Sequence, residues 1–401
     1  MKLMKPVILG VAALFVSFLT GCDMPQKEPT APVTLRIATF NVSMDASNYI
    51  AAEQWQEAGA DALPQALRDG HPQIKAIAEI IQHVRPDILI LNEFDYLPEA
   101  DVLAKFQQDY LEVSQNGEAP IAFPYSYTGP VNTGRSSPFD LNRDGKKTGV
   151  GEDAWAYGNY LGQYGMAILS RYPLNQQTSR TFQYFRWGDL PGALQPLVPN
   201  SYEPWYSPAA WAEMPLSSKS HWDIVAEVGG FDLHLLVSHP TPPVFDGEEN
   251  RNGRRNFDEI RFWKEYIGRA PTDFIYDDQG RRGGLSENKR FVIAGDLNAS
   301  IESEDNLPGA IEQLLEHPLV QGDFVPTSKG GAAHTPDNPL AGQHTASWRK
   351  RADYVLPSSY GIKIIDGGVF WPLAEEDKAE LVSERERSSD HRLVWLDIQL
   401  Q

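Results

Sequence analysis

The stretch Phe291-Val292-Ile293-Ala294-Gly295-Asp296-Leu297-Asn298-Ala299 predicts a buried strand that breaks at Gly295 and then presents an acid and an amide two residues apart. Side chains two apart on an extended chain point to the same side, so Asp296 and Asn298 are expected to face one cleft while Leu297 packs the other way. A carboxylate can hold a metal or draw a proton from water, and a carboxamide can donate to an oxyanion. The alternative is a turn that merely ends the strand, because Gly, Asp and Asn all form turns readily.

Apolar runs of similar length recur on both sides of this stretch. Residues 35–42 and 87–93 predict two strands, and apolar residues at helical spacing between Pro72 and Pro86 predict a helix that connects them. Further strands are expected at 166–170, from 174 onward, at 221–228 and 231–239, and at 352–356, 362–365, 369–371 and 393–400, with helices at 258–267 and around 311–315. Many strands, few helices and long loops favour an α/β layered sandwich.

The N-terminus has the pattern of an export signal. Lys2 and Lys5 precede an apolar run over residues 7–19 that is too short for a comfortable membrane span, and Leu19-Thr20-Gly21-Cys22 closes it. This ending resembles the lipobox of bacterial lipoproteins, so residues 1–21 are expected to be a lipoprotein signal peptide and Cys22 to carry the lipid. A plain secretory signal is the alternative. Residues 22–33 then form a Pro-rich tether, and the protein would face the periplasm or the exterior from a membrane that the sequence does not specify.

Composition restricts the partners. Cys22 is the only cysteine, which excludes an intrachain disulfide and a cysteine-only metal site. The chain has 35 Lys and Arg against 54 Asp and Glu, a net charge of −19. Because nonspecific duplex binding depends on Lys and Arg displacing counterions from phosphates, duplex DNA is a poor substrate candidate. No obligate protein partner is inferred.

Unusual polar residues stand at several expected strand ends, and the wording around them is informative. The segments are Ala38-Thr39-Phe40-Asn41, Leu91-Asn92-Glu93, Gly165-Met166-Ala167-Ile168-Leu169-Ser170-Arg171, Ser238-His239-Pro240, Gly295-Asp296-Leu297-Asn298, Arg351-Ala352-Asp353-Tyr354 and Ser388-Ser389-Asp390-His391. In this order they resemble the endonuclease/exonuclease/phosphatase superfamily. The resemblance covers residues 34–401 and implies a four-layer α/β/β/α sandwich with two packed mixed sheets.

The resemblance also implies a role for each polar residue. Glu93, helped by Asn41, would hold a divalent cation, with Asp390 as a second ligand or an acceptor for metal-bound water. Hard oxygen donors suit Mg²⁺ or Mn²⁺ better than zinc. Asp296 would orient and deprotonate the attacking water, Asn298 would donate to the oxyanion, and His239 would donate to a phosphate oxygen. Finally, Asp353 would pair with His391, fix its tautomer and favour the imidazolium.

Three further residues are candidates for substrate binding. Lys219 and His221 lie in a Ser-rich segment just before a predicted strand, where they could contact phosphate or mark only a solvated hairpin entrance. Arg255, with its neighbours Arg251 and Arg254, could hold a second phosphate or simply balance nearby acids. One departure from the family is Asn92, which stands where Gln is common before the metal-binding acid.

A long insertion is expected near residues 129–164. Within it, Asp140, Asn142 and Asp144 place oxygen-bearing side chains at alternate positions, and Gly145 follows, which is the opening pattern of a calcium loop. The usual glutamate at the twelfth position is replaced by Gly151. A structural Ca²⁺ site of looser geometry and a plain Asx-turn loop therefore both remain open.

Together these features predict an extracytoplasmic, metal-dependent phosphoesterase that hydrolyses phosphomonoesters or phosphodiesters by in-line attack of water. Small phosphate esters or lipid head groups are favoured over duplex DNA. The alternatives are an extracellular nuclease that scavenges nucleic acid and a lipoprotein that binds phosphate esters without hydrolysing them.

Overall fold

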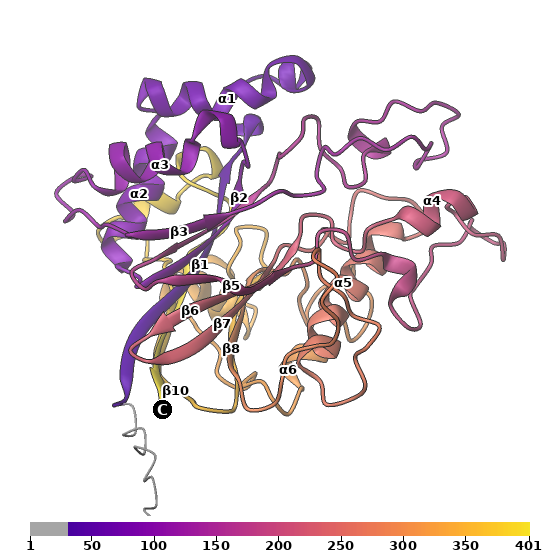
Figure 1. Ribbon diagram of the computed structural model, residues 1–401. Coiled ribbons are helices and arrows are strands. Elements are labelled where there is room, and N and C mark those ends of the chain that lie inside the picture. The colour runs from indigo at the N-terminus through magenta and orange to yellow at the C-terminus, as the bar shows by residue number, and fades with distance from the viewer. Residues whose placement is uncertain (1–30) are drawn as a thin grey trace, which may run out of the picture.

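The computed structural model describes residues 31–401, which form two mixed β-sheets packed face to face (Figure 1). The predicted signal peptide, the predicted lipidation site Cys22 and most of the predicted tether lie outside these residues. The six-stranded sheet has the order β10-β11-β1-β2-β4-β3, with β1 and β2 parallel and the other neighbours antiparallel. Its strands are β1 (Val33–Met44), β2 (Ile88–Phe94), β3 (Tyr125–Thr128), β4 (Met166–Ser170), β10 (Ile362–Val369) and β11 (Val394–Leu400).

The five-stranded sheet has the order β5-β6-β7-β8-β9, and only β7 and β8 run parallel. Its strands are β5 (Leu174–Thr181), β6 (His221–Val228), β7 (Phe231–Ser238), β8 (Arg290–Asp296) and β9 (Asp353–Pro357). Strand β8 alternates as its sequence requires. Val292 and Ala294 join the hydrophobic core that includes the first sheet, whereas Phe291 and Ile293 join a second core with α5. Asp296 therefore leaves the strand on the side of the first sheet.

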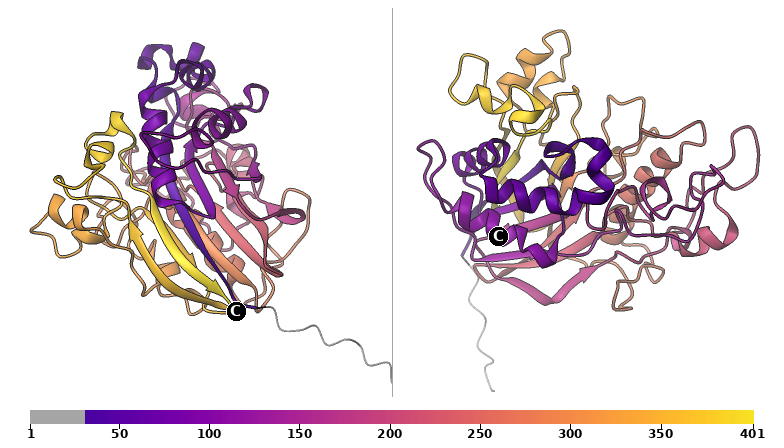
Figure 2. Two further views of the ribbon diagram at one scale, coloured as in Figure 1. Left: turned by 90° about the vertical axis from the view of Figure 1, so that its left-hand side faces the viewer. Right: turned by 90° about the horizontal axis from the view of Figure 1, so that it is seen from above.

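Helices cover the outer faces of both sheets, so the predicted four-layer α/β/β/α sandwich is confirmed (Figures 1 and 2). The longer ones are α1 (Trp55–Asp69) and α2 (Pro72–Val84) against the six-stranded sheet and α5 (Arg251–Ile267) against the five-stranded sheet; the shorter ones are α3 (Val102–Phe106), α4 (Pro208–Glu213), α6 (Glu312–Leu315) and α7 (Lys329–His334). Within residues 31–401, none of the helices has the length and apolar character needed to cross a membrane.

Several element predictions need correction. Helix α1 and strand β3 were not expected, and α5 begins at Arg251 rather than at residue 258. The two strands expected at 362–365 and 369–371 form the single strand β10, because Asp366, Gly367 and Gly368 interrupt the apolar run without ending the pairing with β11. In α1 the buried positions are mostly small residues and Pro64, which gives a helical period but little hydrophobic signal.

Loops that enter and leave the sheets at one end build the surroundings of the site. The predicted insertion follows β3 and lies near α4 in Figure 1. Trp205, close before α4, donates its indole N–H to the carbonyl oxygen of Leu141 in the insertion at 2.9 Å. The insertion is therefore fastened to the segment before β6 rather than extending freely into solvent.

Candidate active site

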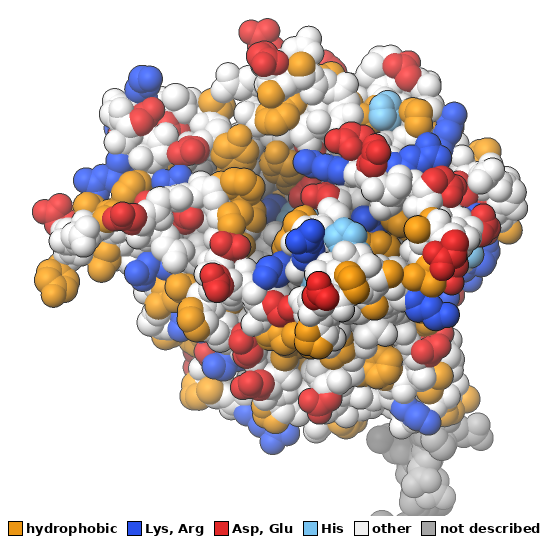
Figure 3. Space-filling model, turned by 180° about the vertical axis from the view of Figure 1, so that it is seen from behind, with side chains coloured by type: hydrophobic (Ala, Val, Ile, Leu, Met, Phe, Trp, Pro, Cys, Tyr) orange, Lys and Arg blue, Asp and Glu red, His pale blue; other side chains and the backbone are white. Residues whose placement is uncertain are grey.

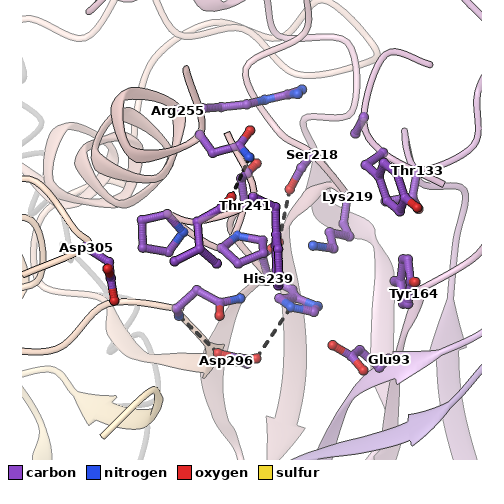
Figure 4. A pocket seen from close by; sticks show the side chains of 18 of the residues that line it. Glu93, Thr133, Tyr164, Ser218, Lys219, His239, Thr241, Arg255, Asp296 and Asp305 are labelled. Carbon is purple, nitrogen blue, oxygen red and sulfur yellow. Dashed lines mark hydrogen bonds and ion pairs between the residues drawn. The ribbon is translucent and has the colours of Figure 1, made fainter. Parts of the chain in front are cut away.

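The polar residues predicted from strand ends converge on one cavity of about 800 Å³. Its lining includes Glu93 near the end of β2, His239 directly after β7, Asp296 at the end of β8, and His391 before β11. In Figure 4, His239 lies above Asp296 and Glu93 lies to one side of it. Both sheets contribute side chains to this lining, so the site lies where the two sheets meet.

Asp296 is the centre of this group. Its Oδ2 atom accepts a hydrogen bond from Nδ2 of Asn41 at 3.0 Å and lies 3.5 Å from Nε2 of His239 and 3.7 Å from Nε2 of His391. Burial raises the pKa of Asp296 to about 6, with His391 opposing the increase and Asp353 adding to it. A carboxylate with this pKa is ionised at neutral pH and can still accept a proton effectively.

His391 is held by Asp353 as predicted. Its Nδ1 atom lies 2.8 Å from Oδ2 of Asp353, which also accepts the Thr345 hydroxyl at 2.7 Å. Burial alone would lower the pKa of His391, but the charges of Asp353 and Asp296 hold it well above its ordinary value. His391 is therefore the imidazolium at neutral pH.

His239 is electrostatically different. It is buried, and burial together with the positive charges of Lys219 and His391 holds its pKa well below the ordinary value. Its Nδ1 atom has no hydrogen-bond partner among the described residues. The ring is neutral and offers one N–H, so a neutral His239 and a positively charged His391 flank Asp296.

The turn after β8 combines the two alternatives predicted from its sequence: it ends the strand, and it directs two polar side chains to the cavity. Asn298 donates its backbone N–H to Oδ1 of Asp296 at 3.0 Å, which makes an Asx turn, and both side chains line the cavity while Leu297 is buried in the second core. Gly295 has φ = +144°, and a Cβ atom there would lie 2.1 Å from the carbonyl oxygen of Ser238. Only glycine lets β8 and β7 approach this closely at the site.

The candidate metal position is the acidic side of the cavity. Among the described residues, ligand atoms of Glu93, His239 and Asp296 all lie within 4.8 Å of one another. Burial and the nearby charges of Asp45 and Asp390 raise the pKa of Glu93 to about 7. An acid so crowded by other acids is stabilised by a cation, and the oxygen donors of this side fit Mg²⁺ or Mn²⁺. A second group, Asp296, Asp353 and His391, already forms ion pairs internally.

Comparison with known proteins agrees with this arrangement. Residues 38–391 match the model of the endonuclease/exonuclease/phosphatase family. The chain belongs to this family. Its members are hydrolases that act on phosphoester bonds and use divalent metals. Comparison with curated proteins gives no match.

Solved structures of this family also resemble the chain at low sequence identity. A family protein from Beutenbergia cavernae is 16% identical with a TM-score of 0.46, covering 92% of this chain and 72% of its own. The human nocturnin catalytic domain with bound sulfate is 12% identical with a TM-score of 0.43, covering 92% and 97%. Staphylococcus aureus beta toxin with bound magnesium ions is 13% identical with a TM-score of 0.41, covering 91% and 99%.

Two residues predicted as metal ligands in this member of the endonuclease/exonuclease/phosphatase family have other contacts as well. Asn41 donates to Asp296 and accepts the backbone N–H of Ser43 at 3.1 Å. Asp390 lines the cavity, accepts the Ser43 hydroxyl at 3.3 Å and lies 3.8 Å from Arg385. Asp390 does not belong to the groups of His, Cys, Asp and Glu with metal-ligand spacing among the described residues. Asn41 directly positions the carboxylate of Asp296.

The sequence analysis missed Asn92 as a positioning residue. Its Oδ1 atom accepts the backbone N–H of Asp296 at 3.1 Å and the hydroxyl of Thr39 at 3.3 Å, so it ties β2 to the end of β8. In the sequence, Asn92 is only a departure from the family pattern.

Asp45 is a second residue that was not predicted from the sequence. It lies directly after β1, and its charge acts on Glu93. An acid three residues after the strand predicted at 35–42 was the available signal.

The three substrate-binding candidates have different outcomes. Lys219 is nearly buried and lines the cavity, on the same side as Tyr164 and Thr133 in Figure 4. His221 does not line it, so that prediction is wrong. Its Nδ1 atom lies 2.8 Å from the Ser217 hydroxyl and its Nε2 atom 2.8 Å from the carbonyl oxygen of Glu259.

Arg255 reaches the cavity wall, but most of its N–H groups are already used. It donates to four backbone carbonyls, those of Trp155, Pro215, Leu216 and Ser217, at 2.9 to 3.3 Å. These bonds fasten two loop segments together and leave one N–H of the guanidinium, so a phosphate contact stays a prediction.

The predicted calcium loop is stabilised by Asx-type hydrogen bonds. Oδ1 atoms of Asp140 and Asn142 each accept the N–H of Asp144 at 3.1 Å, and Oδ2 of Asp140 accepts that of Gly145 at 3.0 Å. Asp153, just beyond the loop, accepts N–H groups of Leu141 and Thr148. These bonds leave a second lone pair on each oxygen, so Ca²⁺ binding stays a prediction.

Proposed function

We propose that this chain is an exported, lipid-anchored phosphoesterase that hydrolyses phosphomonoesters or phosphodiesters by in-line attack of water with the help of a divalent cation. One observation carries the proposal. In a family of phosphoester hydrolases, the buried carboxylate of Asp296 lies within 4 Å of His239 and His391 at the end of a cavity. A phosphate beside Asp296 would be within reach of this base, of the positively charged His391 and of the neutral donor His239.

The residues divide the chemistry according to their charge. Asp296, held by Asn41 and by the backbone bond to Asn92, accepts the proton of the attacking water. The imidazolium of His391 donates to a phosphate oxygen and balances its increasing negative charge. His239 donates a neutral N–H, and Asn298 offers a carboxamide, one N–H of which is used by the carbonyl oxygen of Pro240 at 3.2 Å.

Glu93 is the principal ligand that we assign to the divalent cation, with the amide oxygen of Asn41 and the carboxylate of Asp390 as further oxygen donors. When bound, Mg²⁺ or Mn²⁺ would neutralise charge on the phosphate and on its leaving oxygen. Glu93 has left-handed backbone geometry (φ = +53°) at the end of its strand, a conformation that non-glycine residues seldom adopt without a functional or packing reason.

Charge favours small esters or lipid head groups over nucleic acid. The net charge of −19 repels a polyanion, and Figure 3 shows acidic side chains interspersed with basic ones rather than a continuous basic patch on that face. The N-terminal pattern that ends at Cys22 supports export and lipidation. Incorporation of labelled palmitate in cells, lost in Cys22→Ser, tests this part separately.

Activity is tested with the full chain purified in detergent. A nitrophenyl phosphomonoester, bis(nitrophenyl) phosphate, sphingomyelin and plasmid DNA are each supplied with Mg²⁺, Mn²⁺, Ca²⁺ or a chelator. We expect turnover of a small ester or the lipid with Mg²⁺ or Mn²⁺, abolished by the chelator and by Asp296→Ala or His391→Ala. Turnover that both variants retain would overturn the site, and no turnover of any compound would support a binding protein instead. Preference for plasmid DNA would support the nuclease.

A further inference from the structure

One part of the cavity lining differs in character from the residues around Asp296. This part is apolar and largely aromatic, and it comes from the insertion, from the segment around α4 and from the loop after β7: Leu141, Trp155, Tyr157, Tyr206, Met214 and Phe245. We call these six residues the aromatic chamber. None of them takes part in the chemistry assigned to Asp296 and the two histidines, so the chamber needs a separate explanation.

The inner wall of the chamber is preformed. Leu141, Trp155, Tyr206 and Met214 are all less than 10% exposed and belong to the second hydrophobic core. The four carbonyl bonds of Arg255 connect Trp155 in the insertion with residues 215–217. Because the buried guanidinium already fixes this wall, little conformational entropy is lost there when a ligand binds.

The outer wall is exposed to solvent. Phe245 is 85% exposed and Tyr157 is 52% exposed, although both line the cavity. Other aromatic side chains are exposed as well, among them Tyr184 at 54% and Tyr202 at 98%, but these two do not line the cavity. Phe245 and Tyr157 are therefore exposed aromatic residues of a lining that also includes the buried Trp155 and Tyr206.

The charges around the chamber indicate that the ligand is uncharged at this end. Glu152 and Asp305 line the cavity, and Arg251 is engaged by Glu152 and Glu249 at 3.1 Å each. Most N–H groups of the Arg255 guanidinium are used by carbonyls. A second phosphate would therefore meet two acids and no unpaired arginine in this part of the described structure.

We propose that the aromatic chamber binds the alcohol portion of the phosphoester and that this alcohol is an uncharged group bearing a ring. The proposal rests on the proposed function, because it needs the phosphate to lie beside Asp296. A cavity of about 800 Å³ has the size of a small-molecule site and accommodates a phosphate together with a ring system. Aromatic rings in the lining favour a ring-bearing group through stacked or edge-to-face contacts, which add stability beyond the buried area.

Binding of non-hydrolysable phosphonates tests this without requiring catalysis. Methylphosphonate, hexylphosphonate and naphthylmethylphosphonate are titrated calorimetrically into the full chain in detergent with Mg²⁺. The ring-bearing compound should bind at least about tenfold more tightly than the other two. Tyr157→Ala and Phe245→Ala should each weaken it about threefold or more and leave methylphosphonate unchanged. Tyr202→Ala is the matched control, since Tyr202 is 98% exposed and does not line the cavity.

The outcomes separate the two proposals. Equal affinity for hexylphosphonate and naphthylmethylphosphonate, or equal weakening in Tyr202→Ala, overturns the aromatic chamber as a ring site. Hydrolysis of small esters with no such preference overturns the chamber and leaves the phosphoesterase intact. A clear ring preference in a protein that hydrolyses nothing leaves the chamber and removes the reaction. If no phosphonate binds, the chamber proposal fails, and turnover of the small esters then decides the proposed function separately.

Discussion

The Nδ1 atom of His391 lies 2.8 Å from Oδ2 of Asp353, whereas its Nε2 atom lies 3.7 Å from Oδ2 of Asp296. The ion pair with Asp353 holds the pKa of His391 above its ordinary value, so activity that needs the imidazolium should persist into alkaline solution. In Asp353→Asn we expect kcat/KM to fall about 100-fold or more, with the alkaline limb of the pH profile moved to lower pH.

A second buried pair provides the control for that experiment. Asp223 lies 2.7 Å from Nδ1 of His234, away from the cavity, so Asp223→Asn should lower stability without moving the pH profile. An unchanged profile in Asp353→Asn would show that Asp353 does not set the charge of His391.

Glu93 should link cation binding to pH. The pKa of Glu93 is raised to about 7 without a cation, and a cation binds the carboxylate, so Mg²⁺ affinity should rise with pH through about 7 and then level. Glu93→Gln should weaken apparent Mg²⁺ affinity at least about 100-fold and remove this pH dependence. The increase in melting temperature with added Mg²⁺ measures affinity independently of turnover. Glu152→Gln, which changes an acid elsewhere in the lining, should behave as wild type.

Gly295 should be less replaceable than a positive-φ glycine at an open turn. Gly295→Ala places a Cβ atom 2.1 Å from a backbone carbonyl, and urea unfolding should give a loss of about 2 kcal/mol or more. Gly117→Ala, with φ = +89° and no atom within 4 Å of the added Cβ, should cost about 1 kcal/mol. Equal losses would mean that β7 and β8 separate without penalty, which the Asn92 bond to Asp296 argues against.

The strands and the catalytic centre could be predicted because their signals are local. Each apolar run predicts a strand, and a polar residue at its end is carried to the rim where the sheets meet, as for Asp296 and Glu93. Helix α1 could not be predicted in this way, because its buried side is made of Ala and Gly with only two Leu residues and an internal Pro64. Small residues leave little contrast between the two sides of a helix.

The substrate-binding residues could not be separated by sequence, because their partners are distant along the chain. His221 and His239 both border strands of one hairpin, but Glu259 in α5 satisfies His221, whereas His239 opens onto the cavity. Arg255 likewise appears as a surface charge in the sequence and is used by carbonyls 38 to 100 residues away. Only the packing of α5 against the five-stranded sheet distinguishes these roles.

His221 should matter for acid stability rather than for substrate. Burial lowers its pKa to about 4, whereas the unfolded chain protonates it near 6.5, so its share of stability is complete above pH 6.5 and is lost as the pH falls towards 4. The full difference is about 3 kcal/mol. In His221→Gln the unfolding free energy should depend less steeply on pH over this range, and KM should be unchanged. A raised KM with an unaltered pH slope would return His221 to the substrate site.

The loop that starts at Asp140 should bind calcium through the lone pairs that its Asx turns leave free. Because Asp144 would supply one of the few carboxylates in this open loop, we expect Ca²⁺ to raise the melting temperature of the wild type and not that of Asp144→Ala. Asp305→Ala, an acid of the cavity rim outside the loop, should keep the Ca²⁺ effect. If Asp144→Ala lowers the melting temperature equally in Ca²⁺ and in chelator, the loop is held by its hydrogen bonds alone.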